Sequence, residues 1–332
     1  RIDGLRLASA QYAATGIGTV RDCAVSPADY ELLRAAREGG VLGVRVRALI
    51  SAFGTTSAAQ VEDLLDAMEP WRYDGDPWLR VWGVKFGLDG GLEAGATEEP
   101  YACDHSFSGT LLWDPDALTE AVEAVVRRGW RVGTHAYGDR AVRTLLDVYE
   151  RVLRRNPGLP ADALVMEHGG LADPEQRTRA VALGVPVTIQ QPLLHDTAEV
   201  EEGFWGPERV ARLFPARGWV DLGAQVSAGS DFPVGQFGAM RSVWGLTTRQ
   251  TVIGVKGPEH AITYDEALTL HTLNAARLNG EQALRGALAP GRLADLTVWD
   301  QDPALCPSDT LRALDPTHTF VGGLLVTSDG GR

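Results

Sequence analysis

The sequence predicts an α/β protein: a (β/α)8 TIM-type barrel that lacks strand 1 in this chain, followed by part of a small β-sandwich domain at the C-terminus. Three observations support this prediction. Short apolar runs alternate with amphipathic helical patterns over most of the chain. Polar residues gather at the ends of these runs. The pattern changes to short strands and turns after residue 285.

Seven apolar, β-rich runs mark the predicted strands, and they lie at residues 16–23, 43–51, 79–90, 130–138, 163–170, 185–193 and 224–234. Amphipathic stretches between them predict helices, for example at 26–40, 114–130, 139–156 and 172–184. Several of these stretches begin with Asp or Ser near Pro and end on Gly or Asn, which are helix start and stop signals. This order predicts parallel strands joined by crossover helices. After the seventh run we expect a loop of roughly 25 residues and then a helix at 263–280.

A doubly wound sheet is the alternative arrangement of seven parallel strands. However, no glycine fingerprint follows the first run, as a dinucleotide-binding sheet requires. Polar or ionisable residues instead occupy the carboxyl ends of the runs, where a barrel builds its active site, and these are Asp22, Lys85, His135, His168, Gln191 and Asp231. We therefore predict a barrel with strands 2–8 at residues 1–285. Residues 286–332 are predicted to be the C-terminal portion of a small β-domain.

The composition is that of an ordinary soluble globular protein, with 44% apolar and 23% charged residues. A net charge of −13 argues against nucleic-acid partners and anionic membrane surfaces. No apolar run reaches the ~18 residues that indicate a membrane span, and three cysteines without paired spacing predict reduced thiols. We expect a cytoplasmic protein that takes a small-molecule substrate and whose self-association, if any, is a homodimer.

Four chemically capable side chains fall at the ends of the runs, namely Lys85, His135, His168 and Asp231. Each has an ordinary explanation when taken alone: a lysine that reaches the surface, two hydrogen-bonded histidines and an aspartate that caps a turn. Together they favour a metal centre, because two neutral imidazoles and a carboxylate suit one or two divalent ions, zinc above all. A buried, neutral Lys85 could add carbon dioxide and bridge two ions as a carbamate. Asp231 could bind one ion and accept a proton from the attacking water.

The sequence resembles the amidohydrolase superfamily over nearly its whole length, through VKFGLDGG, THAYGDRA, MEHGG, GSDFPV, TLNAARLNG and GALAPGRLADLTVWDQDP. More narrowly, it resembles the amidohydrolase-3 branch, the YtcJ-like metal-dependent hydrolases that include N-substituted formamide deformylases. The resemblance implies that Lys85 is the carboxylated bridging lysine and that His135 and His168 bind one metal ion. It also implies that Asp231 is a metal ligand and the general base. His195 in QQPLLHD is implied as a substrate-binding residue.

The chain departs from the family's pattern at the first strand. The family carries a His-x-His pair there, whereas no two of the seven histidines in this chain are separated by one residue. Residues 1–23 resemble the helix after strand 1 and the start of strand 2. Either these residues are the C-terminal part of a longer protein, or the protein has lost strand 1 and is not an enzyme. We favour the first explanation because a barrel without one strand exposes two long sheet edges, which natural proteins avoid.

The leading functional prediction is a metal-dependent hydrolase of a carbon–nitrogen bond other than a peptide bond, in an amide or in an N-acyl or N-formyl amine. One alternative is a catalytically inactive binding or regulatory protein on the same scaffold. Another is a metal-dependent deaminase or cyclic amidase, because a fold does not fix a reaction. Aromatic residues in the predicted loops either line an apolar substrate pocket or pack together, and these are Tyr101, Phe107, Trp113, Phe204 and Trp205.

Overall fold

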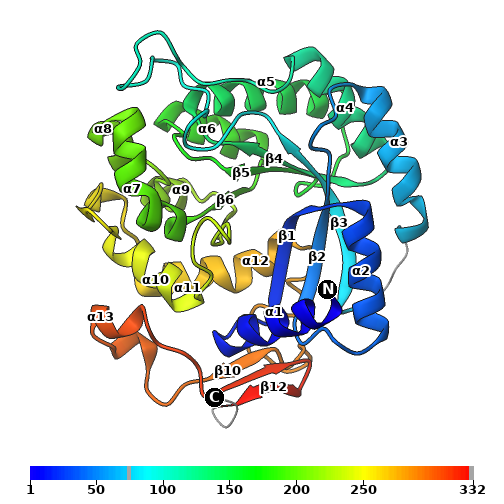
Figure 1. The fold of residues 1–332 in the computed structure, drawn as a ribbon, viewed down its shortest axis with the longest axis vertical. Coiled ribbons are helices and arrows are strands. Elements are labelled where there is room, and N and C mark those ends of the chain that lie inside the picture. The colour runs from blue at the N-terminus through cyan, green and yellow to red at the C-terminus, as the bar shows by residue number, and fades with distance from the viewer. Residues whose placement is uncertain (73–75, 329–332) are drawn as a thin grey trace.

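A computed structural model describes residues 1–72 and 76–328. Seven parallel strands follow one another in chain order and form one curled sheet (Figure 1). They are β1 (Thr19–Val25), β2 (Arg45–Ser51), β3 (Leu79–Gly87), β4 (Arg131–Ala136), β5 (Leu164–His168), β6 (Val187–Ile189) and β7 (Val226–Ala228). Each strand overlaps one of the predicted runs, so the predicted α/β class and parallel strand order are confirmed.

The curled sheet is a half-barrel. Within the described residues, the edges of the sheet are β1, which pairs only with β2, and β7, which pairs only with β6. The register places Lys85 beside Gly133, and Ala136 beside His168. Because the carboxyl ends of parallel strands meet at one rim, the predicted site residues on β3, β4 and β5 approach one another there.

Helices lie on the outer side of the sheet, with α2 to α6 following its curve (Figure 1). The local start signals work as predicted: the Ser26 hydroxyl accepts a hydrogen bond from the Asp29 amide, and Asp173 and Gln176 form a capping box. No helix in the described part of the chain is both long and apolar enough to cross a membrane. The helices up to β7 are α1 (Ile2–Ala14), α2 (Pro27–Glu38), α3 (Ala58–Met68), α4 (Pro115–Arg127), α5 (Asp139–Arg155), α6 (Pro174–Leu183), α7 (Gln191–Trp205), α8 (Pro207–Ala211) and α9 (Ala216–Asp221).

The prediction of a loop of roughly 25 residues after the seventh strand is wrong. This segment contains α10 (Ala239–Thr248) and a short hairpin of β8 (Gln250–Thr251) and β9 (Gly254–Val255). The helix forms because apolar side chains recur on one face and are buried, namely Met240, Val243, Trp244 and Leu246. The helix predicted at 263–280 divides into α11 (Tyr264–His271) and α12 (Leu273–Leu278), since Thr272 leaves the helical conformation with φ −114° and ψ −89°.

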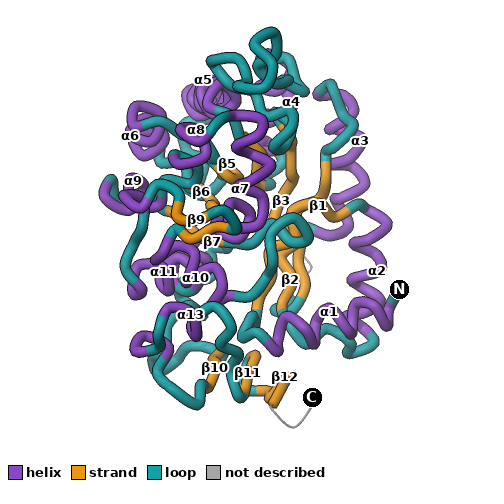
Figure 2. The backbone as a smooth tube through the Cα atoms, turned by 60° about the vertical axis from the view of Figure 1, so that its left-hand side comes forward, coloured by secondary structure: helices purple, strands orange, loops and turns teal. Residues whose placement is uncertain are grey.

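The C-terminal strands form a separate antiparallel sheet below the large one (Figure 2). Its strands are β10 (Leu296–Val298), β11 (His318–Val321) and β12 (Leu324–Ser328), and the short helix α13 (Ser308–Leu311) precedes β11. This sheet packs beside α1, where the Thr319 hydroxyl donates to the Ala13 carbonyl at 2.7 Å. The predicted change of pattern is therefore observed, while the domain boundary at residue 285 stays a prediction.

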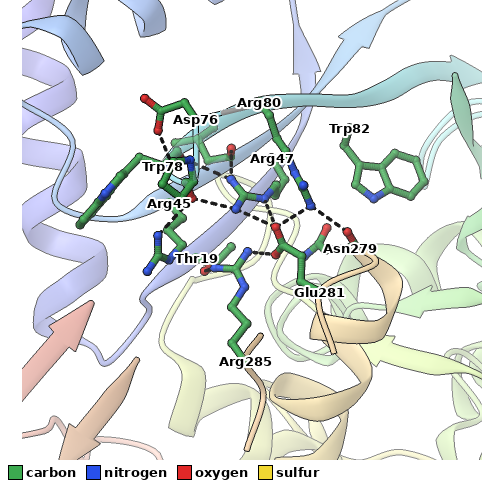
Figure 3. Close-up of polar contacts among 12 residues, drawn as sticks. Thr19, Arg45, Arg47, Asp76, Trp78, Arg80, Trp82, Asn279, Glu281 and Arg285 are labelled. Carbon is green, nitrogen blue, oxygen red and sulfur yellow. Dashed lines mark hydrogen bonds and ion pairs between the residues drawn. The ribbon is translucent and has the colours of Figure 1, made fainter. Parts of the chain in front are cut away.

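A buried cluster of ion pairs joins the segment after α12 to the amino ends of the first strands (Figure 3). The Glu281 carboxylate is 3% exposed and contacts the guanidinium groups of Arg47 at 2.8 Å, Arg80 at 2.5 Å, and Arg285. Arg80 also donates to the Asn279 carbonyl at 3.0 Å. This cluster lies at the end of the sheet opposite the predicted site, where a role in stability is expected.

Candidate metal centre

The structure places the four predicted ligands at the carboxyl rim of the sheet. Lys85 lies near the end of β3, His135 on β4, His168 at the last position of β5, and Asp231 shortly after β7. The imidazole rings of His135 and His168 meet edge to face, with 4.5 Å between their centroids. Asp231 lies close enough to Lys85 and His135 for their charges to act on its carboxyl group.

Hydrogen bonds determine which nitrogen of each imidazole carries a proton. Nε2 of His135 lies 3.0 Å from the Gly90 carbonyl and 3.3 Å from Oδ1 of Asp89. Since both oxygens accept, this nitrogen donates and Nδ1 keeps the lone pair. Nδ1 of His168 lies 2.8 Å from Oε1 of Gln190, so here Nε2 keeps the lone pair. When neutral, each imidazole thus retains one nitrogen that can bind a metal, and the two retain different nitrogens.

Two residues of the site, His168 and Asp231, have unusual backbone conformations. His168 has φ +75° and Asp231 has φ +59°, in the left-handed region that residues with a Cβ rarely adopt. Gly169, which follows His168, also has a positive φ, and a Cβ there would lie 2.9 Å from a methyl group of Val187. The surrounding sheet therefore holds these turns in place, as is common at functional sites.

Burial and neighbouring charges favour the neutral forms of two site residues. Burial lowers the pKa of the Lys85 ammonium, and the charge of Arg21 contributes. Burial, together with His135 and Lys85, lowers the pKa of His168 well below its usual value. Desolvation raises the pKa of the Asp231 carboxyl, although Lys85 and His135 oppose this rise. Neutral amine and imidazole are the forms that react with carbon dioxide and bind metals.

An ion pair that sequence reasoning missed lies beneath the site. A guanidinium nitrogen of Arg21 on β1 lies 2.6 Å from Oε1 of Glu167 on β5, and both side chains are largely buried. Burial alone would raise the pKa of Glu167, but Arg21 and Lys85 outweigh it and lower the pKa. A Cβ at Gly133 would lie 2.4 Å from Oε1 of Glu167, so a larger residue here would have to displace this carboxylate from its place beside Arg21. The sequence signal was a carboxylate within the apolar run of β5.

Asp89 organises the loops that surround the site. Its carboxylate accepts hydrogen bonds from the backbone amides of Ala96, Tyr137 and Gly138 at 2.9–3.0 Å. The carboxylate therefore fixes the turn after His135 to the loop after β3. This agrees with the structural role that a buried aspartate after a strand would have.

The side chains at the rim fit a divalent ion by their chemistry. Two imidazoles, each hydrogen-bonded through one ring nitrogen, a carboxylate and a lysine shifted toward its neutral form are side chains that bind such ions. In the described ranges, no group of three or more His, Cys, Asp or Glu side chains is close enough to hold an ion without further ligands. His135, His168 and Asp231 belong to these residue types, so the three side chains as placed do not by themselves form a group that could hold an ion. A carbamate on Lys85, which the resemblance implies, would add a further ligand.

His195 lies apart from these four residues. It belongs to α7, its Nδ1 donates to the Gln250 carbonyl at 2.8 Å, and its ring meets Trp244 edge to face at 5.1 Å. With Asp309 and Arg312 it lines a separate hollow of about 520 Å³. Its role in substrate binding stays a prediction, and none of its observed contacts supports that role at the rim.

The loop aromatic residues pack against one another. The ring of Tyr101 lies 5.0 Å from that of Phe107 and 5.9 Å from that of Trp205, edge to face in both cases. Tyr101, Trp113 and Trp205 are all at most 6% exposed. These contacts favour the packing explanation over an apolar substrate pocket.

Tyr137 and Glu201 form a buried pair behind the two histidines. The Tyr137 ring lies 6.2 Å from that of His135 and 5.9 Å from that of His168, and its hydroxyl donates to the Glu201 carboxylate. Burial raises the pKa of Glu201 to about 7. Glu201 belongs to α7, so this pair connects α7 to the rim of the sheet.

The raised pKa of Glu201 predicts a loss of stability as pH increases. The folded protein keeps this proton up to about pH 7, whereas the unfolded chain releases it near the ordinary glutamate pKa of 4.5. The contribution of this proton to the free energy of unfolding is complete below pH 4.5, and it falls by about 3 kcal/mol between pH 4.5 and 7. Urea denaturation at pH 5 and pH 7.5 should therefore show a smaller decrease in Glu201→Gln than in the unmodified protein. Equal decreases in both proteins would contradict this assignment.

A family model described as the amidohydrolase family matches residues 2–327. The chain belongs to the amidohydrolase family. The resemblance predicted from the motifs is therefore confirmed. The curled sheet, with its site residues at the carboxyl rim, is consistent with the TIM-barrel-like amidohydrolase fold.

Three proteins illustrate the similarity of this chain to known ones. It is 28% identical over 320 residues to N-substituted formamide deformylase of Arthrobacter pascens. This match covers 95% of this chain and 58% of that protein. It is 29% identical over 259 residues to Protein LONG AFTER FAR-RED 3 of Arabidopsis thaliana, covering 74% and 43%, respectively. A solved structure, an uncharacterized metal-dependent hydrolase from Pyrococcus horikoshii OT3, has a TM-score of 0.79 and 23% identity, covering 93% and 61%. The chain thus spans about half the length of the two relatives compared by sequence.

Proposed function

We propose that this amidohydrolase is a metal-dependent hydrolase that cleaves a carbon–nitrogen bond other than a peptide bond, in an amide or an N-acyl or N-formyl amine. The observation that carries the proposal is the pair of adjacent histidines with complementary lone pairs, beside a carboxylate and a lysine shifted toward its neutral form. Membership of the amidohydrolase family and 28% identity to a formamide deformylase support the choice of bond.

His135, His168 and Asp231 are proposed to hold one or two zinc ions, with Lys85 as a bridging carbamate. A divalent ion at such a site polarises a carbonyl oxygen and increases the acidity of water. The carbamate forms when the neutral Lys85 nitrogen adds to the carbon of carbon dioxide and loses a proton. The lowered pKa of Lys85 supports this step, because only the neutral amine has the lone pair that reacts.

Asp231 is proposed to move the proton during hydrolysis. Its carboxylate accepts a proton from the attacking water and delivers it to the nitrogen of the leaving amine. The desolvation that raises its pKa makes the carboxylate a better proton acceptor than an exposed one. His135 and His168 keep their ring orientations through the hydrogen bonds to Gly90 and Gln190.

The finer features of the fold are also proposals. We infer that an eighth strand between β1 and β7 closes the sheet into a (β/α)8 barrel, since these two strands are its outer members. The strands β10 to β12 are proposed to belong to a β-sandwich. A small-molecule substrate, a homodimer and a cytoplasmic location remain proposals.

Metal content provides the first test of the proposed function. Protein purified without chelator should contain about one or two zinc ions per chain by inductively coupled plasma mass spectrometry. His168→Asn should lower that content because it removes a nitrogen ligand. His318→Asn is the matched control, since His318 lies in β11 of the small sheet and should leave the content unchanged. A metal-free protein, or full content in His168→Asn, would contradict the proposed site.

The same preparations should release free amine from a panel of N-formyl and N-acetyl primary amines. Chelator treatment should abolish this release, and added zinc should restore it. Release of ammonia from amino heterocycles instead would favour a deaminase. Metal-bound protein that hydrolyses neither class would favour a binding or regulatory protein.

A further inference from the structure

A continuous chain of polar contacts runs from Arg21 to His168 through the inside of the sheet. The Arg21 guanidinium contacts Oε1 of Glu167 at 2.6 Å, and the Thr188 hydroxyl lies 2.7 Å from Oε2 of Glu167. Nε2 of Gln190 lies 3.0 Å from that same hydroxyl oxygen, and its Oε1 lies 2.8 Å from Nδ1 of His168. The chain therefore joins a buried ion pair to one of the two histidines.

The sheet register builds this chain. Glu167 on β5 pairs with Thr188 on the neighbouring strand β6, and Gln190 follows two residues later on the same side. Glu167, Thr188, Gln190 and His168 are between 3% and 6% exposed. Because little water reaches these groups, the protein's own donors and acceptors must satisfy one another.

The ion pair sets the direction of every hydrogen bond in the chain. As a carboxylate facing Arg21, Glu167 can only accept, so Thr188 must use its single hydroxyl proton there. The Thr188 oxygen is then an acceptor, and the Gln190 amide must turn its NH₂ group toward it. This orientation leaves the Gln190 carbonyl oxygen facing His168, whose Nδ1 must donate. The opposite direction would point the Thr188 hydroxyl away from Glu167 and leave that carboxylate oxygen without this donor.

We propose that the Arg21–Glu167 ion pair fixes the tautomer of His168 through Thr188 and Gln190, so that Nε2 is the nitrogen offered to the ligand at the rim. Thr188 and Gln190 are positioning residues, since they act on the site only through His168. Their contribution to metal affinity rests on the proposed function, whereas the tautomer is a property of the metal-free protein.

Nitrogen-15 NMR of the histidine side chains in metal-free protein at neutral pH tests this proposal directly. The signals of His168 are assigned by their loss in His168→Asn. We expect unmodified protein to hold His168 as the tautomer protonated at Nδ1. Thr188→Val removes the hydroxyl at nearly constant volume, and we expect a mixture of the two tautomers in this variant. Gln190→Leu should give the same result if Thr188→Val does not fold.

Thr134→Val is the matched control for Thr188→Val. Thr134 is a fully buried threonine on β4 whose hydroxyl bonds the Tyr149 hydroxyl at 2.8 Å, outside the chain from Arg21 to His168. It should leave His168 protonated at Nδ1. Gln190→Glu should also preserve this tautomer, because a carboxylate accepts from Nδ1 as the amide oxygen does.

The NMR result and the metal result have separate meanings. His168 protonated at Nε2 in unmodified protein, or an unchanged tautomer in both Thr188→Val and Gln190→Leu, would overturn the inference whatever the protein binds. If zinc binds, Thr188→Val should weaken its affinity by about 10–100-fold in a competition titration with a chromophoric chelator, and Thr134→Val should not. If zinc does not bind, the proposed function fails while the NMR result still decides the tautomer.

Discussion

Replacing Asp231 with asparagine should lower kcat for amine release by about 10²–10⁴-fold while the metal content stays near that of the unmodified protein. Asparagine has nearly the same size and keeps one oxygen that can bind a metal. Its amide cannot take up a proton at neutral pH, so it cannot pass one from water to the leaving nitrogen. The measurement compares kcat and metal content in the same preparation, which separates loss of the base from loss of the ion.

Asp196→Asn is a suitable control for this experiment. Asp196 lies on α7, pairs with Arg241 at 2.8 Å and accepts the Gln236 amide at 3.1 Å, so it supports the same loop as Asp231 from outside the rim. A small decrease in kcat is expected, because a partly exposed pair of this kind contributes at most about 1 kcal/mol. If Asp231→Asn retained full turnover with metal bound, the assignment of Asp231 as the base would be wrong.

Replacing Glu281 with glutamine should lower the free energy of unfolding by about 3–5 kcal/mol. The Glu281 carboxylate is the common partner of Arg47, Arg80 and Arg285 (Figure 3). Without its charge, Arg47 and Arg285 would lie near each other in a buried place, with the more distant Asp76 and Asp295 to offset them. Burial and the adjacent arginines already lower the pKa of both guanidinium groups to about 9. A loss of this size is a large part of the ~5–15 kcal/mol that stabilises a typical domain.

Urea denaturation at pH 7 would measure this loss, with Glu98→Gln as the control. Glu98 also pairs with an arginine, Arg143 at 2.5 Å, but both side chains are about half exposed, at 42% and 50%. Removing an exposed charge of this kind should cost about 1 kcal/mol or less. Similar losses in the two variants would show that burial of the Glu281 cluster has no special importance for stability.

Local features of the sequence were sufficient to predict the order of the strands and most of the helices. Apolar runs predicted all seven parallel strands, and capping signals such as Ser26 and Asp173 marked the starts of helices, since both depend on residues near in the chain. The prediction failed at α10, where a loop of roughly 25 residues was expected. It also failed at Thr272, whose non-helical backbone conformation divides one predicted helix into two.

The sequence by itself determined the family and the candidate site residues, because each motif is a short run of residues that can be read without knowledge of its surroundings. Only the tertiary structure decided how those residues are held. The register of β5 and β6 brings Thr188 to Glu167, and the curl of the sheet brings Arg21 from β1 to Glu167. The tertiary structure also shows His195 donating to the Gln250 carbonyl and packing on Trp244. Such contacts join residues more than twenty positions apart, and hydrogen-bond direction depends on every partner in the network, so no local pattern contains them.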